Sequence, residues 1–198
     1  RRDRSRRFVP DKPFGNFWSL GSAWIFSNES FLKDHHSWLS YGKLRGSIGI
    51  TGNDGIGDYG YLSTYTNTIQ YGATNAVVPS AQIANPNFQW EVNRKLEAAL
   101  ELGFWHDQLL FSTSFYRNRS SNQLINYSLP SITGSVGYTA NLPAIVQNEG
   151  WEFELNDNLI RSNSSDWTIS ANLTIPNNKL VAFPELYNSS YANGFVIG

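Results

Sequence analysis

Apolar and polar residues alternate with a period of two in several stretches of the chain, most clearly at 91–104. Side chains of a strand point to opposite faces in turn, so this stretch predicts a strand with one apolar and one polar face. The apolar positions are Val92, Leu96, Ala98, Leu100, Leu102 and Phe104. The opposite positions are Asn93, Lys95, Glu97, Ala99 and Glu101.

The same alternation predicts five further strands, at 15–27, 43–51, 109–117, 151–156 and 167–175. A tight turn is expected at 104–108, with the other shorter connections at 28–41 (Ser30–Leu32 as a helical turn) and 157–166. Long connections are expected at 52–90, 118–149 and from 176 onward. No helical period of useful length occurs, so the predicted class is all-β.

Short and long connections follow one another in turn, which is typical of an antiparallel outer-membrane β-barrel. Aromatic residues at predicted strand ends suit the girdles that such barrels place at the membrane interfaces, and they are Trp90, Phe104, Trp105, Trp151 and Trp167. A soluble carbohydrate-binding β-sandwich has the same alternation, with its apolar faces packed together. A barrel enzyme is a third reading. The pattern alone leaves these alternatives open.

Composition narrows the function classes. The 198 residues include seven Trp, ten Tyr and twelve Phe, while charged residues make up only 16%. Cys is absent, which excludes a disulfide scaffold and a thiol nucleophile, and no apolar run reaches the roughly 18 residues of a transmembrane helix. The net charge is −1, and no second basic patch follows the Arg-rich start, so a nucleic-acid partner is not expected. The lack of Met indicates a piece of a longer protein.

Several sequence pieces together resemble the barrel of SusC/RagA-type TonB-dependent outer-membrane transporters. They are Asp3 with Ser5, Arg7 and Phe8, Phe17-Trp18-Ser19 leading to Ala23-Trp24, LRGSIGITGN at 44–53, IGDYGYLSTY at 56–65, NPNFQWE at 85–91, NEGWEFELN at 148–156, and Asn178-Lys179-Leu180-Val181. Their order and spacing run through nearly the whole chain. Two departures are visible: Arg4 stands where the family usually has Gly, and Trp18 where Pro is common.

The resemblance implies that residues 1–198 form part of a 22-stranded barrel, holding six to eight strands that cannot close alone. It also implies TonB-dependent import of an oligosaccharide, a peptide or another large nutrient across the outer membrane of a Gram-negative bacterium. The expected partners are outer-membrane lipid, a SusD-like surface lipoprotein and the TonB complex. The plug domain, the TonB box and the remaining strands are expected to lie outside these residues.

Charged residues at polar positions are expected to line the barrel lumen, and they are Lys43, Arg45, Lys95, Glu97, Glu101, Glu152 and Glu154. Paired carboxylates such as Glu152 and Glu154 could in principle hydrolyse a glycoside. We favour a lumen wall, in which these carboxylates bond to Lys43, Arg45 or Lys95. No catalytic residue and no cofactor is therefore expected, and the chain is not expected to be an enzyme.

The remaining candidate sites are weak. His35 and His36 lack a third metal ligand at useful spacing, and Asp54 and Asp58 are explained by turn chemistry as well as by calcium binding. The glycines at 46–60 lack the Gly-Lys-Ser/Thr of a phosphate loop. Tyrosines in the long connections are the best candidates for stacking on a sugar, and they are Tyr59, Tyr61, Tyr65, Tyr71, Tyr127 and Tyr138. The sequence assigns no metal site and no definite substrate-binding residue.

Overall fold

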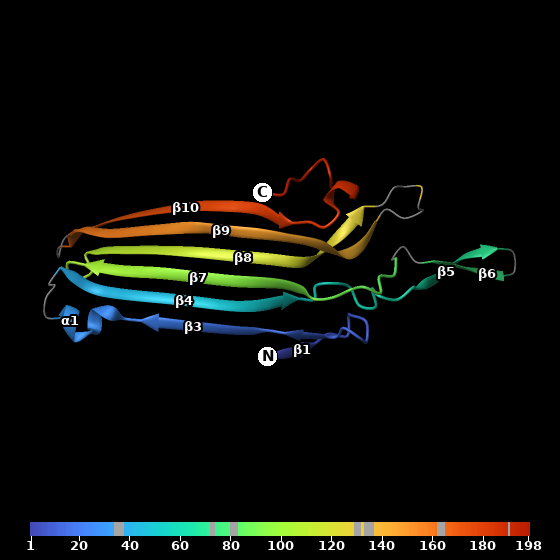
Figure 1. The fold of residues 1–198 in the computed structure, drawn as a ribbon, viewed down its shortest axis with the longest axis horizontal. Helices are drawn as coiled ribbons and strands as arrows, with labels where there is room; N and C mark the ends of the chain where they lie inside the picture. The colour runs from blue at the N-terminus through green and yellow to red at the C-terminus, as the bar shows by residue number, and fades with distance from the viewer. Residues whose placement is uncertain are drawn as a thin grey trace.

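A computed structural model describes residues 1–33, 38–71, 74–79, 83–128, 132, 137–161, 165–189 and 191–198. Its main feature is a single antiparallel sheet of six strands in the order β10-β9-β8-β7-β4-β3 (Figure 1). These strands are β3 (Trp18–Trp24), β4 (Leu39–Asn53), β7 (Glu91–Phe104), β8 (Leu109–Ser128), β9 (Gly137–Arg161) and β10 (Asp166–Ala182). The prediction of an all-β, antiparallel fold is confirmed.

The smaller elements lie around the ends of this sheet. The strands β1 (Arg2–Arg4) and β2 (Phe14–Asn16) form one two-stranded sheet, and β5 (Tyr65–Tyr71) and β6 (Thr74–Pro79) form another. The helical elements are η1 (Phe26–Asn28), α1 (Ser30–Lys33) and η3 (Leu186–Asn188). Among the described residues, no helix is both long and apolar enough to cross a membrane.

Strand register keeps like residues on the same face of the sheet. Leu44 lies opposite Leu100, and Leu100 lies opposite Thr113, while Lys43 lies opposite Glu101. The apolar positions therefore form a continuous stripe across all six strands, which we call the apolar belt. It contains Trp18, Leu20 and Trp24, Leu44, Ile48 and Ile50, Leu96 to Phe104 at even positions, Leu109 to Phe115 at odd positions, Trp151, Phe153 and Leu155, and Trp167 to Ile175 at odd positions.

The apolar belt is not covered by a second layer of described residues. Leu173 is 57% exposed, Ile169 46% and Leu20 69%. A soluble sandwich would pack this face against another sheet, so the described structure gives that alternative no support. On β10 the belt runs from Trp167 to Ile175, eight residue steps that cover about 26 Å. At a strand tilt of about 40° this length spans about 20 Å of membrane, most of the roughly 25 Å apolar band of an outer-membrane barrel.

The short turn at one end of the sheet is held by side-chain hydrogen bonds. Trp105, His106 and Asp107 all have positive φ angles, which are uncommon for residues other than glycine. The Ser40 hydroxyl donates to the Asp107 carboxylate at 2.6 Å and accepts from the Asp107 backbone N–H at 2.9 Å. These contacts stabilise the predicted turn between β7 and β8.

One predicted long connection is largely strand, and a second contains a hairpin. The expected connection at 118–149 belongs mostly to β8 and β9, which extend to Ser128 and start again at Gly137. The expected connection at 52–90 contains the β5–β6 hairpin, which projects beyond the end of the main sheet (Figure 1). Both stretches carry apolar residues, such as Ile69, Val77, Leu142 and Val146, but the Gly, Asn and Pro residues around them favoured a connection over a strand.

Gly150 marks a point where the wall leaves no space for a side chain. A Cβ at this buried position on β9 would lie 2.8 Å from the Ile175 carbonyl oxygen and 2.8 Å from the Tyr116 hydroxyl. We expect Gly150→Ala to lower the free energy of unfolding by about 1–3 kcal/mol. At Gly21 the nearest atoms would lie 3.7 Å away, so Gly21→Ala is the control and should change little. Urea unfolding of the full-length protein in lipid vesicles measures both, and equal effects would contradict this packing.

Candidate functional site

The face opposite the apolar belt carries the predicted lumen residues. Lys43 lies opposite Glu101, Ser47 opposite Glu97, and Gly49 opposite Lys95. On the other half of the sheet, Ser114 lies opposite Glu152 and Ser112 opposite Glu154. The structure therefore places all seven predicted charged residues on one face, which we call the polar face.

Two cations and two carboxylates form a network on this face. The Lys43 ammonium lies 3.2 Å from a Glu101 carboxylate oxygen, and Arg45 Nε lies 3.0 Å from the other one. The Arg45 guanidinium also pairs with Glu97. These side chains are 26–40% exposed, so solvent weakens the pairs and the network contributes modestly to stability. It fixes the charged groups in place on the wall.

Arg45 is the cation that joins both carboxylates. Arg45→Ala should lower the free energy of unfolding by about 0.5–1 kcal/mol at low salt, because Glu97 and Glu101 then lose the cation that they share. The loss should shrink in 1 M NaCl, where exposed charges are screened. Lys95→Ala is the control, since Lys95 makes no ion pair with any described residue. Urea unfolding at both salt concentrations measures the difference, and a salt-independent loss would count against the network.

Glu152 and Glu154 are partnered differently from the prediction. Glu152 accepts a hydrogen bond from the Ser114 hydroxyl at 3.1 Å, and Glu154 accepts one from the Asn156 side-chain amide at 2.9 Å. The expectation that Lys43, Arg45 or Lys95 would pair with them is wrong, because β8 lies between β9 and the strands β7 and β4 that carry these three cations. Both glutamates are exposed on the open wall, which supports a solvated lining rather than a catalytic pair.

A small core at the long-connection end explains several of the motifs. Phe8, Ile56 and Phe88 are buried together, and Tyr61 and Trp90 pack against them. Trp90 contacts the Phe8 ring at 5.3 Å and donates from its indole N–H to the Pro13 carbonyl at 3.3 Å. Trp90 therefore belongs to this loop core, and its assignment to a membrane girdle is wrong. These buried residues come from three separate motifs, around Phe8, Ile56 and Phe88. No single stretch of the sequence indicates that they pack together.

The acidic loop residues are engaged by the N-terminal segment. The Ser5 hydroxyl donates to Asp54 at 2.8 Å, and Arg7 pairs with Asp58 at 3.0 Å. These contacts engage both aspartates. Within the described residues, no cluster of three or more His, Cys, Asp or Glu residues suits a metal ion. His35 and His36 lie outside the described residues.

The candidate tyrosines fall into two groups. Tyr59 and Tyr65 are 64% and 63% exposed and remain free to contact a solute. Tyr61 packs on the loop core, while the Tyr127 ring lies 6.1 Å from Tyr138. The side chain of Tyr71 lies outside the described part of the structure.

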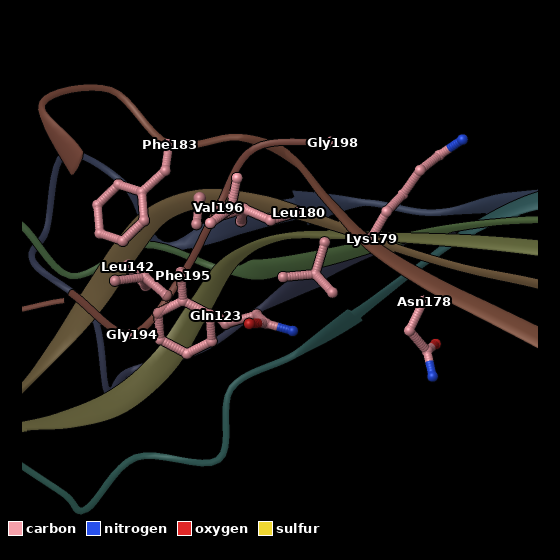
Figure 2. A pocket seen from close by; sticks show the side chains of 12 residues that line it. Gln123, Leu142, Asn178, Lys179, Leu180, Phe183, Gly194, Phe195, Val196 and Gly198 are labelled. Atoms are coloured by element: carbon pink, nitrogen blue, oxygen red, sulfur yellow. The ribbon is translucent and has the colours of Figure 1, made fainter. Parts of the chain in front are cut away.

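An apolar groove lies near the end of β10. Leu142, Leu180, Phe183, Phe195 and Val196 line it (Figure 2). The C-terminal segment forms one wall by running beside β10, where the Gly198 backbone N–H donates to the Leu180 carbonyl at 3.2 Å. The groove carries no arrangement of reactive groups, and it belongs to the packing of this segment.

Comparison with known proteins identifies the sheet. A family model described as TonB dependent receptor-like, beta-barrel, matches residues 1–194. The TonB-dependent receptor P39 of Formosa agariphila is 31% identical over 181 residues, which cover 91% of this chain and 17% of that protein. The TonB-dependent receptor SusC of Bacteroides thetaiotaomicron is 31% identical over 196 residues, which cover 96% of this chain and 19% of that protein.

A solved structure agrees with these relatives. The RagAB peptide importer in its closed-closed state matches with a TM-score of 0.84 at 25% identity, over 93% of this chain and 20% of that chain. The chain thus spans about a fifth of the length of the proteins it matches. The similarities confirm the resemblance to the SusC/RagA type. With one apolar and one polar face on its sheet, the chain belongs to the TonB-dependent receptor-like β-barrel family.

Proposed function

We propose that this chain is part of the wall of a TonB-dependent outer-membrane transporter that imports a large nutrient. The observation that carries the proposal is the exposed apolar belt, which is backed on the same strands by a charged polar face. A strand with lipid on one side and water on the other is what a transmembrane barrel requires. The wall supplies a rigid frame, with no chemical step of its own.

Two relatives support a proposal for the class of solute. One relative is named SusC, and one similar structure is titled a peptide importer. We therefore propose an oligosaccharide or a peptide as the solute, and a SusD-like surface lipoprotein as the partner. The exposed rings of Tyr59 and Tyr65 offer flat surfaces for either solute at the loop end of the wall.

The energy source lies outside these residues in this proposal. A plug domain and a TonB box elsewhere in the full-length protein would couple import to the inner membrane. Residues 1–198 would then hold only part of a barrel of about 22 strands. The six-stranded main sheet has free edges at β10 and β3, which the remaining strands would pair.

A gene deletion tests the proposal. We expect a strain without the full-length gene to lose growth on one member of a panel of sole nutrients: maltoheptaose, xylan oligosaccharides or a tryptic digest of casein. The wild-type gene should restore growth, and a copy without its TonB box should not. Two results would argue against TonB-dependent import. One is a deletion strain that grows as well as the wild type on every nutrient of a larger panel. The other is full restoration of growth by the gene copy that lacks its TonB box.

A further inference from the structure

The outward face of the sheet changes sharply from apolar to charged at one end. On β10 the belt positions Leu173 and Ile175 are followed by Asn177 and Lys179. The same change occurs on the three neighbouring strands, so the residues form one group that we call the outer basic cluster. It consists of Arg94 on β7, Arg117 and Arg119 on β8, Gln147 and Glu149 on β9, and Lys179 on β10.

Strand register places this group on the lipid side of the wall. Glu149 and Gln147 continue the alternate positions of Trp151 and Phe153, which belong to the apolar belt. Figure 2 shows the Lys179 and Asn178 side chains leaving β10 in opposite directions, as neighbours on a strand must. The outer basic cluster therefore lies directly beyond the belt, at the depth where lipid headgroups begin.

The cluster lies at the long-connection end of the sheet. The link from β4 to β7 at this end spans 54–90, whereas the β7–β8 turn at the opposite end spans only 105–108. In outer-membrane barrels the longer loops are extracellular. The cluster accordingly belongs to the outer leaflet, given the barrel orientation of the proposed function.

A buried glutamine organises the charged side chains. Gln147 is 2% exposed, accepts a hydrogen bond from Arg119 and donates one to Glu149 at 2.7 Å. Glu149 also pairs with Lys179 at 3.2 Å. Glu149 is the group's single carboxylate, so it leaves the four cations with an excess of positive charge.

None of the three arginines has a carboxylate partner among the described residues. Arg94 lies directly opposite Arg119 in register, an arrangement of like charges that is unfavourable between strands. Neither Arg94 nor Arg117 makes an ion pair with any residue that the structure describes. An anion between these guanidinium groups would remove the repulsion.

We propose that the outer basic cluster binds the phosphate groups of a phosphorylated lipid headgroup in the outer leaflet. Guanidinium groups match phosphate oxygens with paired N–H donors, and clustered basic side chains next to a membrane span attract anionic headgroups. A lipid phosphate is favoured over a phosphate in solution, because the acyl chains of the same molecule would lie on the apolar belt.

Lipid retention by the full-length protein tests this inference. The purified protein is placed in phosphatidylcholine nanodiscs with 10% lipid A, washed with lipid-free detergent, and weighed by native mass spectrometry. We expect the wild type to retain lipid A, and the double variant Arg94→Gln/Arg119→Gln to retain at least fivefold less. The matched control is Lys95→Gln, which removes a positive charge from the polar face of the same strand and should retain lipid A like the wild type.

Two further measurements use the wild-type protein alone. Raising NaCl from 50 mM to 1 M should reduce lipid A retention by the wild type severalfold, because the attraction is ionic. Inorganic phosphate at 10 mM should displace little lipid A when ionic strength is held constant. Equal retention by the double variant, loss in Lys95→Gln, no preference over phosphatidylcholine, or full displacement by phosphate would each overturn the inference.

Discussion

Leu173→Arg is expected to stop the full-length protein from assembling in the outer membrane. Leu173 lies near the middle of the apolar belt, opposite Phe153, and is 57% exposed on the face that we assign to lipid. An arginine near the bilayer midplane on a barrel surface costs about 2–4 kcal/mol. Assembly is measured as the heat-modifiable, folded fraction of the protein in isolated outer membranes.

The neighbouring residue supplies the control. Thr174 lies on the polar face, opposite Glu152, so Thr174→Arg places the same side chain in water beside a carboxylate. We expect Thr174→Arg to assemble like the wild type. If both variants assembled equally well, or both failed equally, lipid would not be what the apolar belt faces.

Phe8→Ala is expected to destabilise the loop core by about 3–5 kcal/mol, the usual loss for a buried phenylalanine. Phe8 is 2% exposed and packs with Ile56 and Phe88 at the base of the long connection between β4 and β7. Because this core lies outside the main sheet, the barrel should still assemble. Hydrogen exchange in the full-length protein should show protection of residues 54–61 falling by two orders of magnitude or more.

Phe14→Ala is the matched control, since Phe14 is 46% exposed and lies in the same N-terminal region. Its exchange rates over 54–61 should stay close to those of the wild type. Unchanged protection in Phe8→Ala would mean that the N-terminal segment does not hold this loop.

The strand pattern was predictable where the two faces differ in polarity. Residues 91–104 were predicted with the bounds of β7, because Leu96, Leu100 and Leu102 alternate with charged residues up to the turn at Trp105. Beyond the belt this contrast disappears. Arg117 and Arg119 occupy outward positions on β8, so its extension to Ser128 has polar residues on both faces and does not read as a strand.

The polar face was predictable only in part. Lys43, Arg45, Glu97 and Glu101 meet because β4 and β7 are neighbours, although the paired side chains are 52 to 58 residues apart in the chain. The partners of Glu152 depend on strand order, which alternation does not contain. The outer basic cluster was missed as well. The sequence did contain a sign of it. Arg94, Arg117 and Lys179 continue the same alternate positions as the apolar residues of their strands.

The side of the sheet that faces lipid can be measured directly, because residues 1–198 contain no cysteine and any cysteine elsewhere in the full-length protein can be replaced by serine. Spin labels are attached to single cysteines placed in turn at positions 169–175 of the full-length protein in vesicles. We expect odd positions to be accessible to oxygen dissolved in lipid, and even positions to a water-soluble nickel complex. Odd positions that neither reagent reaches would place the apolar belt inside a protein core and contradict the membrane wall.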